Sequence, residues 1–334
     1  MLSSNSSRSD LQYFHTDDPG HRIAETIVMA IIFIIGAVGN PVTAYTVVKN
    51  KKLHNLHNSL TMNIIIVDSL ATFTIVPTQI ATLAYGRWPL NNVACQVNAF
   101  CIIVLSTCAL WTILWLSILR ILLISKPTKY AILVLPKYMV PIVASTWIVA
   151  LGLGCMLFAT DKLAFKPKFA ACFFFFTSVG EMSAFMIPFI IVPTVILSSL
   201  SIAIFRKLKK NGNSTSAQLQ KHSEEKEIAN NYLMLVFVYV ICYFPVYIIE
   251  AESVILQDVP LPHFVYMSVT FLGYLPFSVK TLAYMLTKKE SRDKLRRFFR
   301  KTNKVTFHEE NESGVQNDQG CPANKRKIMG SSQL

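Results

Sequence analysis

Five ionisable side chains lie inside long apolar stretches of the chain: Asp68, Arg120, Glu181, Glu250 and Lys280. A charge placed in hydrocarbon is costly, so such residues pair with one another or mark a binding or conducting site. The chemistry open to them is charge recognition: an internal ion pair, a counter-ion for a ligand, or a step in an ion pathway.

Histidine and cysteine offer little chemistry of another kind. Each of the seven histidines lies in a polar segment, and none has a histidine four residues away, the spacing of helical metal ligands. No two of the seven cysteines form a C-x-x-C pattern. The sequence therefore predicts no metal site and no cofactor, and it disfavours an enzyme such as a membrane hydrolase.

The elements that position these charges are unusually apolar. Of 334 residues, 52% are hydrophobic and 15% are charged, and the mean hydropathy is +0.43. A soluble domain carries about 25% charged residues, so the composition indicates an integral membrane protein. Seven apolar segments each reach the length that crosses a bilayer, where the backbone must be helical. They are Thr26–Val48, Leu60–Leu83, Val93–Ile124, Tyr138–Phe158, Phe173–Phe205, Tyr232–Leu256 and Pro262–Leu286.

The positions of lysine and arginine predict the orientation of these segments. The loops at 49–52, 126–137 and 206–210 and the tail from Lys288 onward are rich in these basic residues. We expect this side to face the cytosol, which places the N-terminus outside the cell. Asn5-Ser6-Ser7 is then an acceptor for glycosylation at Asn5. Because the net charge of +13 gathers beside the membrane, nucleic acid is not expected as a partner.

Two further segments follow the last apolar segment. Ser291–Lys301 places Leu295, Phe298 and Phe299 on one face amid Lys and Arg. This pattern favours a short amphipathic helix on the anionic inner leaflet, with membrane lipids as partners. The alternative is a solvated basic run. We expect the polar residues 302–334 to form a disordered cytoplasmic tail.

Features in every apolar segment resemble the rhodopsin-like family of G-protein-coupled receptors, over about Ile27 to Phe299. In chain order they are Gly39-Asn40, Asp68, Trp88 ahead of Cys95, Arg120, Trp147, Pro193, Cys242-Tyr243-Phe244-Pro245 and Tyr284. The resemblance implies an all-α membrane protein: a seven-transmembrane helix bundle with a short amphipathic eighth helix. The expected parts are an extracellular segment 1–25, a receptor domain 26–301 and the tail.

Further expectations follow from the resemblance. Cys95 and Cys172 would form a disulfide between the third helix and the second extracellular loop, the alternative being two free thiols. Pro245 would act as the hinge of the sixth helix, with Tyr243 in the place of the family's tryptophan. Such a protein sits in the plasma membrane, binds an extracellular ligand and activates a heterotrimeric G protein, with arrestin as a further candidate partner.

The chain departs from the family at Lys280, which stands where the family has the Asn of Asn-Pro-x-x-Tyr. Family members often bind sodium beside the second-helix Asp, here Asp68. Ala109, Pro276 and Phe277 occupy the places of polar sodium ligands. A buried lysine needs an anion and a buried aspartate needs a cation. We therefore expect Lys280 to pair with Asp68 and replace the ion, which makes agonist affinity insensitive to sodium.

A second departure surrounds Arg120. The family has an acidic residue before this arginine, but here Leu119 precedes it. Glu225, at the cytosolic base of the sixth helix, is placed to pair with Arg120 instead. The hypothesis is that this pair holds the resting state more weakly than usual. The alternative is an arginine that extends from a helix end to water.

By resemblance, the ligand pocket opens outward between helices three, five, six and seven. Ile102 stands where receptors for biogenic amines have an Asp, so an amine held by that carboxylate is disfavoured. The other expected pocket residues are Asn98, Ser106, Glu181, Phe185, Tyr247, Glu250, Thr270 and Tyr274. Glu181 and Glu250 would receive a cationic ligand, or else pair with Lys162, Lys166 or Lys168. The Phe173–Phe176 run is expected to be lipid-facing or packing surface.

The sequence thus favours a receptor that binds an extracellular ligand, such as a peptide or a cationic small molecule, and activates a G protein. A decoy that binds without signalling is the alternative, because three activation motifs are altered. A membrane transporter is less favoured, since the two halves of the chain show no internal repeat.

The Arg120–Glu225 hypothesis makes a direct prediction. Glu225→Ala removes the partner of the arginine, so the active state becomes easier to reach and basal signalling rises. An exposed ion pair contributes about 0.5–1 kcal/mol, which corresponds to an increase of about two- to fivefold. G-protein activation in transfected cells, at matched surface expression, measures this; unchanged basal signalling would show that the pair does not hold the resting state.

Overall fold

The computed structural model describes residues 19–49, 56–210, 216–256 and 261–280. All of them belong to one compact unit, residues 1–288.

Within these ranges, six helices are long and apolar enough to cross a membrane. They comprise α2 (Pro19–Val48), α3 (Leu56–Tyr85), α4 (Asn92–Ser125), α6 (Pro136–Ala159), the continuous run of α7 (Val179–Met186), η3 (Ile187–Ile191) and α8 (Val192–Lys210), and α9 (Ser216–Ile255). A short helix, α5 (Pro127–Leu133), follows α4. The expected seventh segment begins as α10 (His263–Tyr274) and the helical residues 276–280. Its remainder, with Tyr284, and the expected eighth helix lie outside the described residues.

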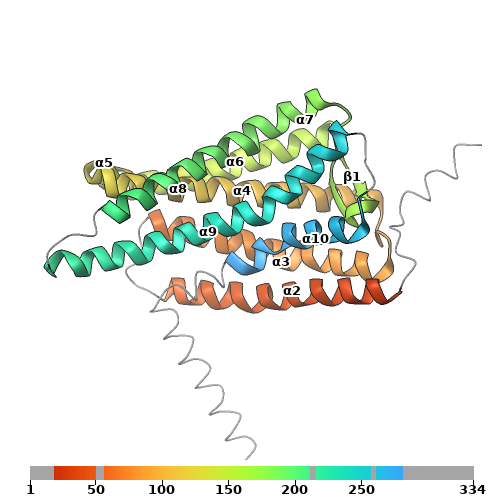
Figure 1. Cartoon of the computed structure of the whole chain (residues 1–334), viewed down its shortest axis with the longest axis horizontal. Helices are drawn as coiled ribbons and strands as arrows, with labels where there is room; N and C mark the ends of the chain where they lie inside the picture. Colours follow the sequence, from red (N-terminus) through yellow and green to blue (C-terminus); the bar gives the residue numbers. More distant parts are fainter. Residues whose placement is uncertain (1–18, 50–55, 211–215, 257–260, 281–334) are drawn as a thin grey trace, which may run out of the picture. The chain divides into compact units, whose positions relative to one another are not determined.

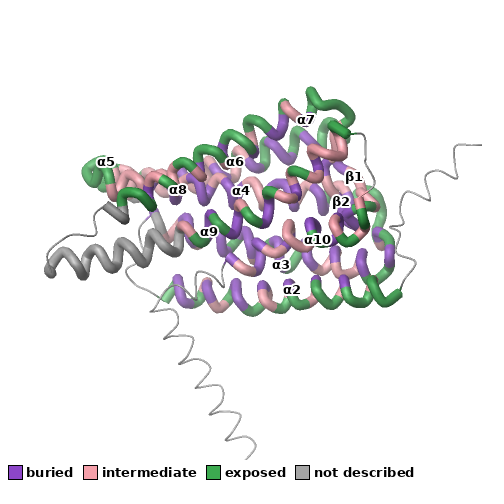
Figure 2. The backbone as a smooth tube through the Cα atoms, viewed as in Figure 1, coloured by how far each residue is buried: buried purple, intermediate pink, exposed green. Residues whose placement is uncertain are grey.

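Helix α4 is the centre of the bundle. It contacts α3, α6, α8 and α9, and 78% of its most apolar stretch is buried, against 22% for the span Val179–Lys207. Helix α2 packs on α3, and buried and exposed residues alternate along the helices around α4 (Figures 1 and 2). The exposed faces carry large apolar side chains such as Ile148 and Phe237. Because such faces are stable only in an apolar medium, they are the lipid-contacting surface.

A two-stranded hairpin covers one end of the bundle. Its strands β1 (Leu163–Lys166) and β2 (Ala171–Phe174) are antiparallel and are joined through the turn η2 (Pro167–Phe169). The expected disulfide is present, since Cys172 of β2 is bonded to Cys95 of α4. Phe165 pairs with Cys172 across the hairpin. The covalent link and the strand pairing together fix the hairpin over α4.

The hairpin corrects one expectation and decides between the two alternatives of another. The fifth membrane segment was expected from Phe173, but it begins at Val179, where the Ser178 side chain accepts a hydrogen bond from the Glu181 backbone N–H. Phe173 and Phe174 belong to β2 and pack against each other with ring centroids 4.2 Å apart. They are therefore packing residues of the hairpin and not lipid-facing. Apolarity alone does not distinguish a covered strand from a membrane helix.

Helices α8 and α9 carry features of the expected helix bends. The turn η3 is π-helical: the Val192 N–H donates to the carbonyl of Ile187, five residues back. It lies directly before Pro193, which has no N–H to donate. Helix α9 is 40 residues long and contains Pro245. It begins at Ser216, well before the expected Tyr232, so Glu225 lies on its extension; the side chain of Glu225 is outside the described residues.

Two glycines on α6 provide a test of packing. A Cβ at Gly154 would lie 2.6 Å from Val104 Cγ2 of α4, whereas a Cβ at Gly152 would meet nothing within 4 Å. Gly154→Ala should therefore destabilise the protein by about 1–3 kcal/mol through overpacking. Gly152→Ala should stabilise it by about 0.5–1 kcal/mol because alanine favours the helix. Thermal unfolding of the detergent-solubilised protein measures both; shifts of the same sign would refute the α4–α6 contact.

Candidate ligand pocket and buried ion pair

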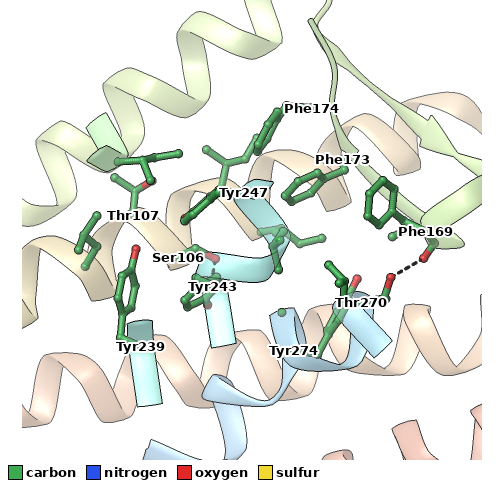
Figure 3. Close-up of a pocket in the computed structure, with 18 of the residues that line it drawn as sticks. Ser106, Thr107, Phe169, Phe173, Phe174, Tyr239, Tyr243, Tyr247, Thr270 and Tyr274 are labelled. Atoms are coloured by element: carbon green, nitrogen blue, oxygen red, sulfur yellow. Dashed lines mark hydrogen bonds between the residues drawn. The ribbon is translucent and has the colours of Figure 1, made fainter. Parts of the chain in front are cut away.

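A cavity of about 80 Å³ lies between α4, the hairpin, α7 with η3, α9 and α10 (Figure 3). Aromatic rings form most of its wall. One group comes from the hairpin and the helix after it: Phe169, Phe173, Phe174, Phe185 and Phe189. The rings of Phe174 and Phe185 are 5.2 Å apart, so the hairpin packs directly on α7. The cavity is thus closed by the same hairpin that the disulfide anchors.

A second aromatic group comes from α9. Tyr239, Tyr243 and Tyr247 recur every four residues and lie along one face of the helix (Figure 3). Ring centroids are 4.8 Å apart for Tyr239 and Tyr243, and 6.3 Å apart for Tyr243 and Tyr247. The Tyr243 hydroxyl donates to Ser106 Oγ of α4 at 3.5 Å. A molecule bound in the cavity would therefore contact α4 and α9 at the same time.

Most of the expected pocket residues meet at this cavity. Those that line it are Ile102, Ser106, Phe185, Tyr247, Thr270 and Tyr274. Thr270 Oγ1 donates to the Phe169 carbonyl at 3.1 Å, and the Tyr274 hydroxyl donates to Gln79 Oε1 at 2.9 Å. These bonds join α10 to η2 and to α3. The remaining three expected residues, Asn98, Glu181 and Glu250, do not line the cavity.

Those three residues have other partners. Asn98 Nδ2 donates to Thr78 Oγ1 at 2.7 Å, between α4 and α3. Glu181 pairs with Lys162 at 2.8 Å. Glu250, which is 1% exposed, pairs with Lys166 at 2.5 Å. Of the two alternatives left open by the sequence, the structure therefore shows the acids paired with lysines of the overlying loop.

The sequence did not identify the hairpin residues of the pocket. Phe169, Phe173 and Phe174 reach the cavity because the strand pairing and the disulfide fold residues 163–174 back over α4. The pairing of Cys95 with Cys172 was a usable signal, since it places the neighbours of Cys172 beside α4. Thr107 and Tyr239 were also missed, although both are within one turn of predicted residues.

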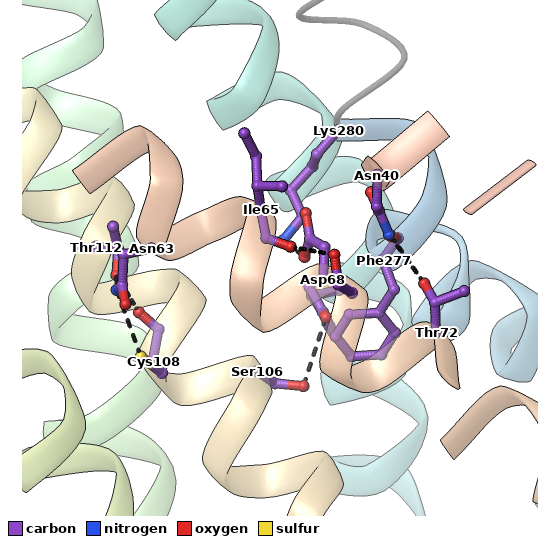
Figure 4. A network of polar contacts seen from close by, with 12 residues as sticks. Asn40, Asn63, Ile65, Asp68, Thr72, Ser106, Cys108, Thr112, Phe277 and Lys280 are labelled. Atoms are coloured by element: carbon purple, nitrogen blue, oxygen red, sulfur yellow. Dashed lines mark hydrogen bonds and ion pairs between the residues drawn. The ribbon is translucent and has the colours of Figure 1, made fainter. Parts of the chain in front are cut away.

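A buried ion pair lies next to the cavity. Lys280 Nζ is 2.7 Å from Asp68 Oδ1, and both side chains are fully buried (Figure 4). This is the pair that the sequence predicts. Lys280 Nζ lies 5.9 Å from the centroid of the Phe277 ring, which itself lines the cavity. The ion pair and the pocket thus share one side chain as a wall.

The backbone of the same segment is fixed to two other helices. Asn40 Nδ2 of α2 donates to the Phe277 carbonyl and to Thr72 Oγ1 of α3, both at 3.1 Å (Figure 4). Ser278 Oγ donates to the Ile32 carbonyl of α2 at 2.7 Å. The Phe277 carbonyl and the Ser278 hydroxyl are therefore both hydrogen-bonded to α2. These bonds fix the backbone that positions the Phe277 ring.

The other expected activation residues do not line the cavity, or they lie outside the described chain. Arg120 is in the last third of α4 and is 5% exposed. Pro245 is in α9, between Tyr243 and Tyr247. The side chain of Glu225, together with Tyr284 and Asn5, lies outside the described residues. The roles of all these residues stay predictions.

Comparison with known proteins agrees with this architecture. A family model described as "7 transmembrane receptor (rhodopsin family)" matches residues 39–279. The chain is 21% identical to an allatostatin-A receptor of Bombyx mori, over 73% of this chain and 69% of that protein. It is 24% identical to G-protein coupled receptor 183 of Mus musculus, over 76% and 72%. It is 19% identical to the histamine H2 receptor of Canis lupus familiaris, over 86% and 82%.

The chain belongs to the rhodopsin family of seven-transmembrane receptors. It is a multi-pass membrane protein with a receptor fold, and its relatives are receptors and not enzymes. The expected seven-transmembrane helix bundle and the Cys95–Cys172 disulfide are confirmed, whereas the eighth helix stays a prediction.

The Asp68–Lys280 pair is tested by a double-mutant cycle. Asp68→Asn or Lys280→Met alone leaves one buried charge without its partner, which costs about 3–5 kcal/mol. The double variant leaves none and should be more stable than either single variant. Surface expression and thermal unfolding of the four proteins measure this; a double variant no better than the worse single variant would disprove the coupling.

Sodium is the companion control for this cycle. Since Lys280 already neutralises Asp68, the wild-type melting temperature should be equal in sodium chloride and in choline chloride at the same ionic strength. Stabilisation by sodium alone would show that an ion still enters the site.

Proposed function

We propose that this protein is a plasma-membrane receptor that binds an extracellular ligand in the cavity under the hairpin and activates a heterotrimeric G protein. The observation that carries the proposal is the position of Tyr243. Its ring lines the cavity, its hydroxyl reaches Ser106 of α4, and it lies two residues from Pro245. A ligand that moves this ring acts on α9 at its bend.

The proposed mechanism uses the length of α9. The helix has 40 residues, so at 1.5 Å per residue it extends about 60 Å. Pro245 removes a backbone hydrogen bond, and the helix can change direction there at low cost. A small displacement of Tyr243 and Tyr247 then swings the cytosolic part of α9 away from α4. This movement exposes Arg120 to the transducer, which is a G protein or, in turn, arrestin.

The proposal assigns the parts of the chain accordingly. Residues 1–25 face the outside and carry the glycosylation site at Asn5, 26–301 form the receptor domain, and 302–334 form the cytoplasmic tail. Lipids of the inner leaflet contact Ser291–Lys301. Glu225 and Tyr284 take part in holding and releasing the resting state.

A decoy receptor that binds without signalling is the second candidate. The observation that favours it is the set of altered residues: Leu119 precedes Arg120, Tyr243 replaces the tryptophan, and Lys280 replaces the asparagine. A conducting pathway is not favoured, because Asp68 and Lys280 are fully buried against each other.

Basal signalling separates the two candidates. We expect wild-type receptor to activate at least one G protein above background, and Arg120→Ala to reduce that activity about tenfold because the transducer loses its charged contact. A panel of G-protein dissociation sensors in transfected cells, at matched surface expression, provides the measurement. Activity that does not depend on Arg120 would refute the mechanism, and silence from both proteins would favour the decoy.

A further inference from the structure

The cavity is surrounded by charges, yet none of its lining residues carries one. One buried acid close to the hairpin is Glu250 of α9, at 1% exposure. Its partner, Lys166, comes from β1 of the hairpin that covers the cavity. The Lys166 amine therefore contacts Glu250 from the hairpin side of the cavity, which is the side from which an extracellular ligand would enter.

Lys166 is held in the manner of a bound cationic ligand. Its Nζ is 2.5 Å from Glu250 Oε2. It also lies 5.6 Å from the ring centroid of Phe169 and 6.0 Å from that of Phe174, and both rings line the cavity. A carboxylate and two aromatic faces are what a protein uses to recognise an ammonium group. The chain supplies this ammonium group itself.

We propose that Lys166 is the specificity-determining residue of the pocket, occupying the cation site beside the cavity so that the receptor takes an uncharged, predominantly apolar ligand. This inference rests on the proposed function, since it assumes that the cavity is where the ligand binds. A cationic ligand has to displace an amine that is joined to the protein and already desolvated. An uncharged ligand avoids that competition.

The polar groups in the cavity suit such a ligand. They are hydroxyls: those of Ser106, Thr107 and Thr270 and the phenols of the tyrosines. The 3.5 Å contact between Tyr243 and Ser106 is at the outer limit of a hydrogen bond, so a ligand hydroxyl or carbonyl group can replace it without loss. The remaining wall is aliphatic and aromatic, which favours a hydrocarbon skeleton.

The other acids near this end of the bundle do not provide a free cation site in the cavity. Glu181 is bonded to Lys162 and to the hydroxyl and backbone N–H of Thr177. Glu25 pairs with His263 at 2.8 Å, between α2 and α10. Glu252 follows Glu250 by two residues, about 200° around the helix, and it does not line the cavity.

The test measures the charge preference of the cavity without any ligand being known. A Ser106→Cys variant of the full-length receptor places a thiol in the cavity, and wild type gives the background from the native cysteines. Two methanethiosulfonate reagents of similar size serve as probes, one with a neutral alkyl group and one with an ammonium group. The ratio of their labelling rates reports the selectivity.

We expect the neutral reagent to label Ser106→Cys faster than the cationic one. Adding Lys166→Met removes the hairpin amine from Glu250, and the ratio should shift toward the cationic reagent by about tenfold, as a focused negative potential does. Lys166→Arg keeps the charge and should keep the wild-type ratio. Lys162→Met removes the equivalent lysine of Glu181, which is outside the cavity, and should leave the ratio unchanged.

The remaining outcomes also decide the matter. Glu250→Gln added to Lys166→Met should return the ratio toward the neutral reagent, and it removes the carboxylate that Lys166→Met deprives of this lysine. Faster labelling by the cationic reagent in the presence of Lys166, no shift in Lys166→Met, or no labelling by either reagent would each overturn the proposal. Because labelling needs no G protein, a receptor that fails to signal is distinguished from one whose pocket accepts cations.

Discussion

The structure depends on the cost of leaving a charge unpaired in a medium of low dielectric constant. Two pairs meet that cost inside the bundle: Asp68 with Lys280, and Glu250 with Lys166. Each joins segments far apart in the chain, and each lies beside the cavity. The pairs therefore act as electrostatic links among α3, α9, the hairpin and the last described helical residues. The pocket between them can be apolar because Asp68 and Glu250 are each paired with a lysine.

The aromatic side chains around the cavity pack against one another and form a continuous wall. Phe277 separates the cavity from Lys280, the tyrosines of α9 face α4, and the hairpin phenylalanines pack onto α7. Rings in contact cannot shift independently in a close-packed interior. A displacement of one ring therefore also displaces α9 and the Asp68–Lys280 pair. This continuity is what a receptor of the proposed kind needs between its outer and inner faces.

Much of this architecture is readable in the sequence, for reasons that differ between regions. The membrane helices follow from apolar runs of sufficient length, and the Asp68–Lys280 pair follows because each residue had one plausible counter-ion. The hairpin could not be predicted in this way, because Phe173 and Phe174 are as apolar as the helix that follows them. The partner of Glu250 was undecided because a cationic ligand and the loop lysines Lys162, Lys166 and Lys168 were equal candidates. Only the fold of residues 163–174, fixed by the disulfide and by strand pairing, places Lys166 there.

The use of Lys280 as the cation beside Asp68 has a consequence for membrane voltage. A mobile ion in such a site can leave along the bundle, and its charge then moves through the transmembrane field, which is worth about 2.3 kcal/mol per elementary charge per 100 mV. An ammonium group on a side chain travels only as far as its own four-carbon stem allows. The equilibrium between resting and active states therefore loses the voltage dependence that ion exit would give it. In a receptor of the proposed kind, a tethered ammonium group in place of a mobile ion removes this one source of voltage dependence.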